Sequence, residues 1–101
     1  MPDKLFMFLA EGVASEAATK RVGARHALML FGRAQDIATA ETCARVYAEQ
    51  RGWLFVGVKR GKELSKDISE ITDGVLQMAA KSALENGSGL VIYKDEITPD
   101  S

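Results

Sequence analysis

The sequence contains only one cysteine and one histidine. A single cysteine, Cys43, excludes an intrachain disulfide and is typical of a protein from a reducing compartment, so we expect the cytoplasm. One cysteine and one histidine cannot provide the ligand spacing of a zinc site, and we expect no metal ion and no cofactor. We expect Cys43 to be a buried, inert thiol on the apolar side of a helix. We expect His26 to lie at the start of a strand without a catalytic role.

Long apolar runs are also lacking. Every apolar segment is far shorter than the roughly 20 residues of a membrane-spanning helix, so we expect no membrane segment. The run Leu5–Ala10 follows Lys4, as the apolar part of a secretion signal would. It is shorter than the minimum of about 7 residues for such a signal and ends at Glu11. We therefore interpret it as a strand.

The chain has no excess of charge of one sign, because its net charge is −1. Bulk attraction to nucleic acid or to an anionic membrane is therefore not expected. The distribution is uneven, since residues 25–62 contain seven basic and three acidic residues and residues 63–101 contain three basic and eight acidic ones. The usual explanation of such a basic middle segment is a solvated surface. No helix-turn-helix or RNA-binding fingerprint is present, so nucleic acid is not the expected partner.

The apolar segments that are present predict four strands and two helices. Strands are indicated by short runs rich in Phe, Leu, Val, Ile and Tyr, namely Leu5–Ala10, His26–Phe31, Trp53–Val58 and Leu90–Tyr93. Helices are indicated by apolar residues with i, i+3, i+4 spacing in Asp36–Arg51 and roughly Asp67–Asn86. The first apolar stripe comprises Ala40, Cys43, Ala44 and Tyr47, and the second comprises Ile68, Ile71, Val75, Met78, Ala79 and Ala83.

The ends of both helices carry recognisable signals. Asp36 and Asp67 are expected N-caps, although the second helix has an alternative start at Thr72 or Asp73. Gly52 and Gly87 fit the left-handed position that follows the end of a helix.

These elements predict an α/β or α+β fold with the order β-β-α-β-α-β, in one domain over residues 1–95 followed by a flexible tail, 96–101. The expected sheet is four-stranded and mixed, with two helices packed on it. A strand joined to the next through a helix usually gives a parallel pair, so we expect the last three strands to be parallel. The first strand is expected at an edge or antiparallel to the second. The segment Ala14–Ala24 fits either a short helix or a loop.

Both faces of the expected sheet are apolar and should be covered. Two helices can cover both faces thinly or one face well. If both helices lie on one face, the other is an exposed apolar surface of the kind that marks an interface. We therefore expect a homodimer or a protein partner.

The segment GVKRGKEL, Gly57–Leu64, lies where a phosphate-binding loop would follow a strand. A Walker A loop needs four residues between its two glycines, then Lys and then Ser or Thr. Only three residues separate Gly57 from Gly61, and Glu63 replaces the hydroxyl residue that would hold magnesium. Nucleotide hydrolysis by this route is therefore not expected, and we interpret the segment as a basic turn between a strand and a helix.

A weaker anion site remains at the same position. If the second and third strands are parallel, their C-terminal ends lie at one edge of the sheet and lead towards helix N-termini, where anions are favoured. The candidate ligand-binding residues there are Arg33, Lys59, Arg60 and Lys62. The alternative explanation is that Asp36 and Asp67 already cap those helices and that the basic side chains are solvated.

The remaining acidic residues do not converge on a catalytic set. Asp67, Glu70 and Asp73 recur every three residues, a spacing that can serve a hard cation but is also typical of the first turns of a solvated helix. The leading hypothesis is therefore a small non-catalytic binding or regulatory domain that acts as a homodimer or with a protein partner. The alternative is an anionic-ligand-binding domain, or an enzyme, that uses the basic edge.

Overall fold

The computed structural model describes residues 3–18, 20–64 and 71–97. In chain order its elements are β1 (Lys4–Ala14), β2 (Arg25–Ala34), α1 (Ile37–Gln50), β3 (Trp53–Leu64), α2 (Gly74–Asn86) and β4 (Ser88–Glu96). The predicted order β-β-α-β-α-β is confirmed, and the fold is α+β. Of the segment Ala14–Ala24, Ala14 ends β1, and the described residues 15–18 and 20–24 form no helix, which favours the loop over the short helix. The end of the predicted tail, residues 98–101, lies outside the described residues.

The four strands form one sheet in the order β3-β1-β2-β4, and every neighbouring pair is antiparallel. The predicted parallel pairing of the last three strands is therefore wrong. β2 and β3 do run in the same direction, because both are antiparallel to β1, but β1 lies between them. The prediction that β1 is antiparallel to β2 is confirmed, although β1 is central rather than at an edge.

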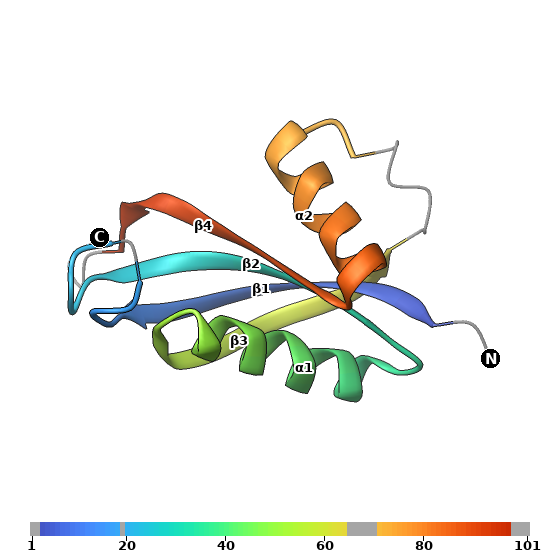
Figure 1. Cartoon of the computed structure of the whole chain (residues 1–101), viewed down its shortest axis with the longest axis horizontal. Coiled ribbons are helices and arrows are strands. Elements are labelled where there is room, and N and C mark those ends of the chain that lie inside the picture. Colours follow the sequence, from blue (N-terminus) through green and yellow to red (C-terminus); the bar gives the residue numbers. More distant parts are fainter. Residues whose placement is uncertain (1–2, 19, 65–70, 98–101) are drawn as a thin grey trace.

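The two helices lie on opposite faces of the sheet (Figure 1). The face under α1, which we call the α1 face, has a core that includes Phe6, Phe8, Leu28, Leu30 and Trp53. The face under α2, the α2 face, has a smaller core that includes Leu5, Phe31 and Val91. Of the two arrangements considered from the sequence, the structure has the one in which each face receives one helix.

Helix α1 packs through a stripe of alanines. Its buried residues are Ala40, Ala44 and Ala48, each four positions from the next. Small side chains let the helix approach the sheet closely, and a Cβ on Gly32 would lie only 2.7 Å from the carbonyl oxygen of Ala40. Cys43 is exposed, so the prediction of a buried thiol is wrong. One residue turns a helix by about 100°, which moves Cys43 off the alanine stripe.

Asp36 caps the N-terminus of α1, as predicted, and gives a testable dependence on pH. Hydrogen bonds from Thr39, first from its backbone N–H and then from its side chain, lower the pKa of Asp36 below its ordinary value of 3.8. The contribution of this cap to stability is therefore present above pH 3.8 and lost as the pH falls through the lowered pKa. We expect wild type to lose stability relative to Asp36→Asn as the pH falls from about 5 to about 2, because asparagine caps equally well but does not titrate. Urea unfolding of both chains across this range measures the effect, and parallel stability curves would contradict it.

Helix α2 begins at Gly74, with Asp73 as its N-cap, which confirms the alternative start. The carboxylate of Asp73 accepts from the backbone N–H groups of Val75 and Leu76, at 2.9 and 3.0 Å. The other predicted N-cap, Asp67, and its neighbour Glu70 lie outside the described residues.

The apolar stripe predicted for this helix is only partly buried. Ala79, Ala80 and Ala83 face the sheet, whereas Val75 and Met78 are 63% and 74% exposed. The predicted left-handed glycines are confirmed, with φ of +99° at Gly87 and +94° at Gly52.

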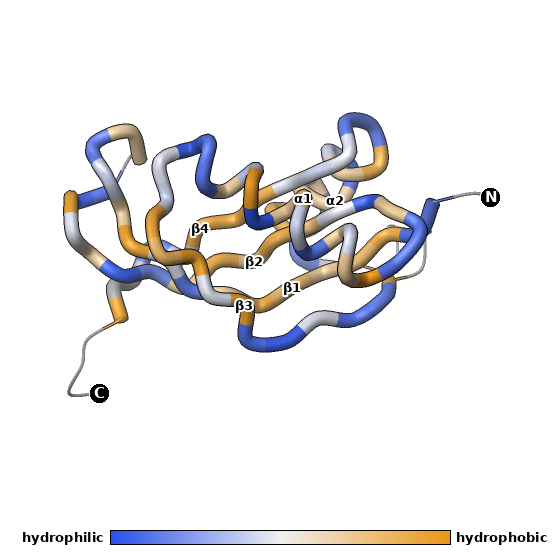
Figure 2. The backbone as a smooth tube through the Cα atoms, turned by 90° about the horizontal axis from the view of Figure 1, so that it is seen from below, coloured by the Kyte–Doolittle hydropathy of each residue, from blue (hydrophilic) through white to orange (hydrophobic). Residues whose placement is uncertain are grey.

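Strand β3 is longer than expected. It continues to Leu64, so the segment Gly57–Leu64 is the second half of an edge strand and not a turn. Figure 2 shows that the residues of this strand change from mainly hydrophobic to mainly hydrophilic along its length. The pairing of β3 with β1 is irregular at two points, between Leu9 and Ala10 and between Glu11 and Val13 of β1.

Candidate ligand-binding site

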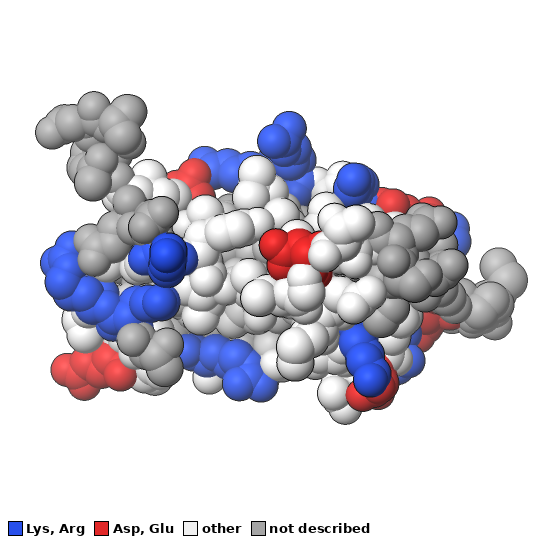
Figure 3. Space-filling model, turned by 90° about the horizontal axis from the view of Figure 1, so that it is seen from above, with Lys and Arg blue, Asp and Glu red and all other residues white. Residues whose placement is uncertain are grey.

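The α2 face is covered only at one end. α2 has 13 residues and β1 has 11, so the helix is about 20 Å long over a strand of about 36 Å. The side chains under the helix are buried, whereas Met7, Leu9 and Met29 further along are half-buried. We call these three residues the open floor. Figure 3 looks down on this face, where residues other than Lys, Arg, Asp and Glu occupy much of the middle around one acidic patch, and Lys and Arg lie mostly along the edges.

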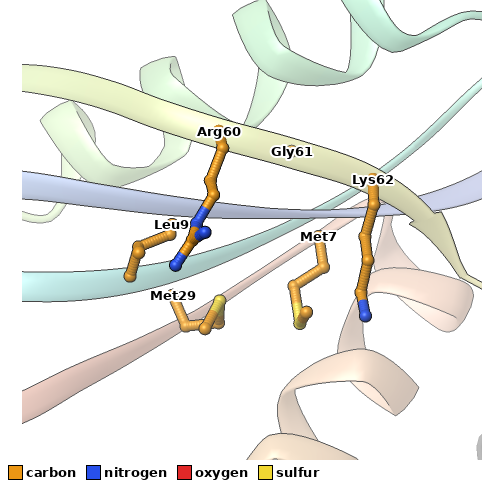
Figure 4. A pocket seen from close by; sticks show the side chains of 6 residues that line it. All are labelled: Met7, Leu9, Met29, Arg60, Gly61 and Lys62. Carbon is orange, nitrogen blue, oxygen red and sulfur yellow. The ribbon is translucent and has the colours of Figure 1, made fainter.

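A hollow of about 310 Å³ lies over the open floor, which lines it together with Arg60, Gly61 and Lys62 of β3. Arg60 and Lys62 leave the strand on the same side as the floor residues (Figure 4). This follows from the pleat, because alternate residues of a strand point to the same face. Gly61, between them, faces the other side, where an added Cβ would lie 2.3 Å from the ring of Phe8.

The basic residues of β3 differ in their partners. Lys59 lies 3.4 Å from the carboxylate of Glu11, which also lies 3.9 Å from Arg25. Arg60 and Lys62 form no ion pair within the described residues. The hollow therefore combines an apolar floor with two cations that are free to meet an anion.

Arg33, the fourth residue of the predicted anion site, lies elsewhere. The C-terminal ends of β2 and β3 do lie at the same end of the sheet, beside Lys4 and Leu5 of β1. However, Arg33 is opposite Leu5, whereas Arg60 is opposite Leu9, about 13 Å further along β1 and on its other side.

The guanidinium of Arg33 is also already engaged. It donates to the carbonyl of Leu84 and lies 3.6 Å from Asp3. Arg33 thus joins the last turn of α2 to the sheet. Asp36 occupies the N-terminus of α1, as the alternative explanation proposed, and Asp73 rather than Asp67 occupies that of α2. Of the four predicted residues, the structure places only Arg60 and Lys62 together without an ion pair among the described residues.

His26 lies in the core of the α1 face. Its Nδ1 is 2.8 Å from the carbonyl oxygen of Tyr93, and because a carbonyl only accepts, Nδ1 carries the proton. Its ring meets the ring of Trp53 edge to face, with centroids 5.6 Å apart. Among the described residues, no three His, Cys, Asp or Glu side chains come together in a way that could hold a metal ion.

The open floor was not identified from the sequence as part of a site. Its three residues have the apolar character and alternation of strand residues that belong to a core. A comparison of the predicted lengths could not have found them, because the predicted helix Asp67–Asn86 is longer than the predicted strand Leu5–Ala10. The open floor follows only from the observed bounds, a shorter α2 and a longer β1.

Comparisons of the chain with protein-family models, curated proteins and solved structures gave no match. Within residues 3–18, 20–64 and 71–97, neither helix is long and apolar enough to cross a membrane.

Proposed function

We propose that this protein is a non-catalytic binding domain that forms a homodimer through its α2 face. The observation that carries the proposal is that this face presents a projecting helix and an open apolar floor side by side. Among the residues that the structure describes, those lining the hollow include no acid, no histidine and no hydroxyl. This composition supports binding rather than general acid–base or nucleophilic catalysis.

A second copy of the chain fits this surface for a geometric reason. In a two-fold dimer the same patch of both copies meets, so a projection in one copy must enter a depression in the other. Rotation about an axis across the strands places each α2 over the open floor of the partner. Met78 and Val75 of α2, which are exposed in one copy, would then be buried against the partner's apolar floor.

The size of this contact predicts a weak dimer. The open floor consists of three half-buried residues, two on β1 and one on β2, and the exposed apolar residues of α2 add only Val75 and Met78. A contact of this size is at or below the low end for a specific interface. We therefore expect a dissociation constant in the micromolar range or above.

The test is sedimentation velocity of the full chain from about 1 to about 200 µM. We expect wild type to change from monomer to dimer over this range. Met78→Arg should raise the dissociation constant at least about tenfold, because it places a charge against an apolar floor. Met78 is 74% exposed, so the substitution should leave the fold intact, which circular dichroism checks.

The matched control is Val46→Arg, an equally drastic change at an exposed residue of α1, on the opposite side of the molecule. It should leave the dissociation constant unchanged. A wild-type chain that stays monomeric at every concentration would overturn the proposal. An equal loss of dimer in Met78→Arg and Val46→Arg would overturn the assignment to the α2 face.

A further inference from the structure

We propose that the hollow over the open floor binds an amphipathic carboxylate, an anion that carries a short alkyl or aryl body. This goes beyond the homodimer, because it assigns a small molecule to the open floor, where the ligand and the α2 helix of a second copy would exclude one another. The carboxylate would lie between Arg60 and Lys62, and the body would lie on Met7, Leu9 and Met29.

The register of the sheet brings the two parts of the site together. Lys62 is opposite Met7 and Arg60 is opposite Leu9 in the pairing of β3 with β1. Leu9 is in turn opposite Met29 in the pairing of β1 with β2. Each cation therefore stands directly beside an apolar floor residue, so that a head group and its body can be bound at once.

The cations suit a carboxylate head group. Two residues apart on one strand, Arg60 and Lys62 have backbones about 7 Å apart, and their long side chains can converge on one group. Arginine can bind a carboxylate through two parallel hydrogen bonds, and lysine adds a compact charge. Neither has an acidic partner among the described residues, so no ion pair need be broken.

The floor suits an apolar body rather than a bare anion or a nucleotide. Two of its three residues are methionines, whose flexible thioethers adapt to ligands of different shape. None of the lining side chains in the described part of the chain is aromatic, so these residues offer no stacking surface of the kind with which nucleobases are usually bound. Its volume of about 310 Å³ is at the lower end of the range for small-molecule sites.

The experiment is a titration followed by NMR of ¹³C-methyl methionine. It uses the Met78→Arg chain, so that binding is measured without the proposed dimer. Octanoate should shift the Met7 and Met29 methyl signals saturably, and 1-octanol should bind at least about tenfold more weakly, because it lacks the charge. Inorganic phosphate, which lacks the body, should leave both signals in place.

Charge-removing variants test the two cations separately. Arg60→Gln and Lys62→Gln, made in the same chain, should each weaken octanoate binding about tenfold. The matched control is Lys59→Gln, which removes the same charge from a neighbouring residue that pairs with Glu11 and does not line the hollow. All three residues are exposed, so the variants should fold, and circular dichroism checks this.

Each other outcome overturns part or all of the proposal. If octanol bound as tightly as octanoate, the cations would have no role in binding. If phosphate bound as tightly as octanoate, the apolar floor would have no role. Absence of saturation, or a response to an acidic peptide but not to octanoate, would overturn the ligand class. The titration uses the Met78→Arg chain, in which the proposed dimer is weakened. Failure of the dimer would therefore appear in sedimentation of wild type, and failure of the ligand site would appear in the titration. In wild type, a shift of the Met78 methyl on adding octanoate would reveal competition between ligand and second copy.

Discussion

Replacing Gly89 with alanine is expected to destabilise the protein by about 3 kcal/mol, within the upper range for an overpacked core. A Cβ at this position would lie 2.2 Å from the carbonyl oxygen of Ala79 and 3.0 Å from its carbonyl carbon. These are backbone atoms in the middle of α2, so no rotation of a side chain can relieve the contact. The helix as a whole would have to move away from β4, and it would lose part of the burial of Ala79, Ala80 and Ala83.

Urea unfolding followed by circular dichroism measures this loss. The matched control is Gly57→Ala, in another edge strand, where an added Cβ meets nothing within 4 Å. That variant should change stability little or raise it by up to about 1 kcal/mol, because alanine restricts the unfolded chain. Equal stabilities of the two variants would show that α2 does not pack on β4 as closely as described.

Trp53→Ala is the second substitution with a large expected effect, a loss of about 3–5 kcal/mol. Trp53 is 1% exposed and belongs to the core of the α1 face, where it also contacts the ring of His26. Its removal would leave a cavity between α1 and the sheet that alanines cannot fill. Domains of this size have total stabilities of about 5–15 kcal/mol, so the variant would lose about a fifth of its stability or more.

The neighbouring residue provides the control for Trp53→Ala. Leu54 is 47% exposed, and Leu54→Ala should cost less than about 1 kcal/mol. Thermal or urea unfolding of both variants, followed by circular dichroism, separates the two cases. If Leu54→Ala were as damaging as Trp53→Ala, the assignment of Trp53 to the core and of Leu54 to the surface would be wrong.

The sequence predicted the elements well because their signals are local. Asp36, Gly52 and Gly87 mark helix ends through their own backbone and side-chain chemistry, which does not depend on the rest of the fold. The four strands were found from short apolar runs for the same reason. Their lengths were underestimated, since the second half of β3 is polar and its pairing with β1 is a long-range contact.

Strand pairing was not predictable from the same signals. The β2–α1–β3 unit does give two strands of the same direction, but these strands are not neighbours, and the β3–α2–β4 unit joins strands of opposite direction. Here β1 inserts between β2 and β3, and α2 leads from one edge of the sheet to the other. Neither the insertion of β1 nor the path of α2 has a local signature in the sequence. The order of the elements was therefore predicted correctly, but the parallel pairing was wrong.

Only the basic residues of the candidate site could be predicted from the sequence. The sequence identified Arg60 and Lys62, but it also grouped them with Lys59, which pairs with Glu11, and with Arg33, which is held by α2. Which basic residues stay unpaired depends on contacts between distant strands. The open floor depends on where a short helix is placed over a longer sheet.

The position of β3 at the edge of the sheet has a consequence for aggregation. One side of this strand has no neighbour in the sheet, and such an edge can add a strand from another chain. If two copies joined through their β3 edges, Lys59, Arg60 and Lys62 of one copy would approach the same residues of the other. Like charges brought together across paired strands are destabilising. This repulsion would therefore oppose the pairing of two copies through their β3 edges, one of the two edges of the sheet.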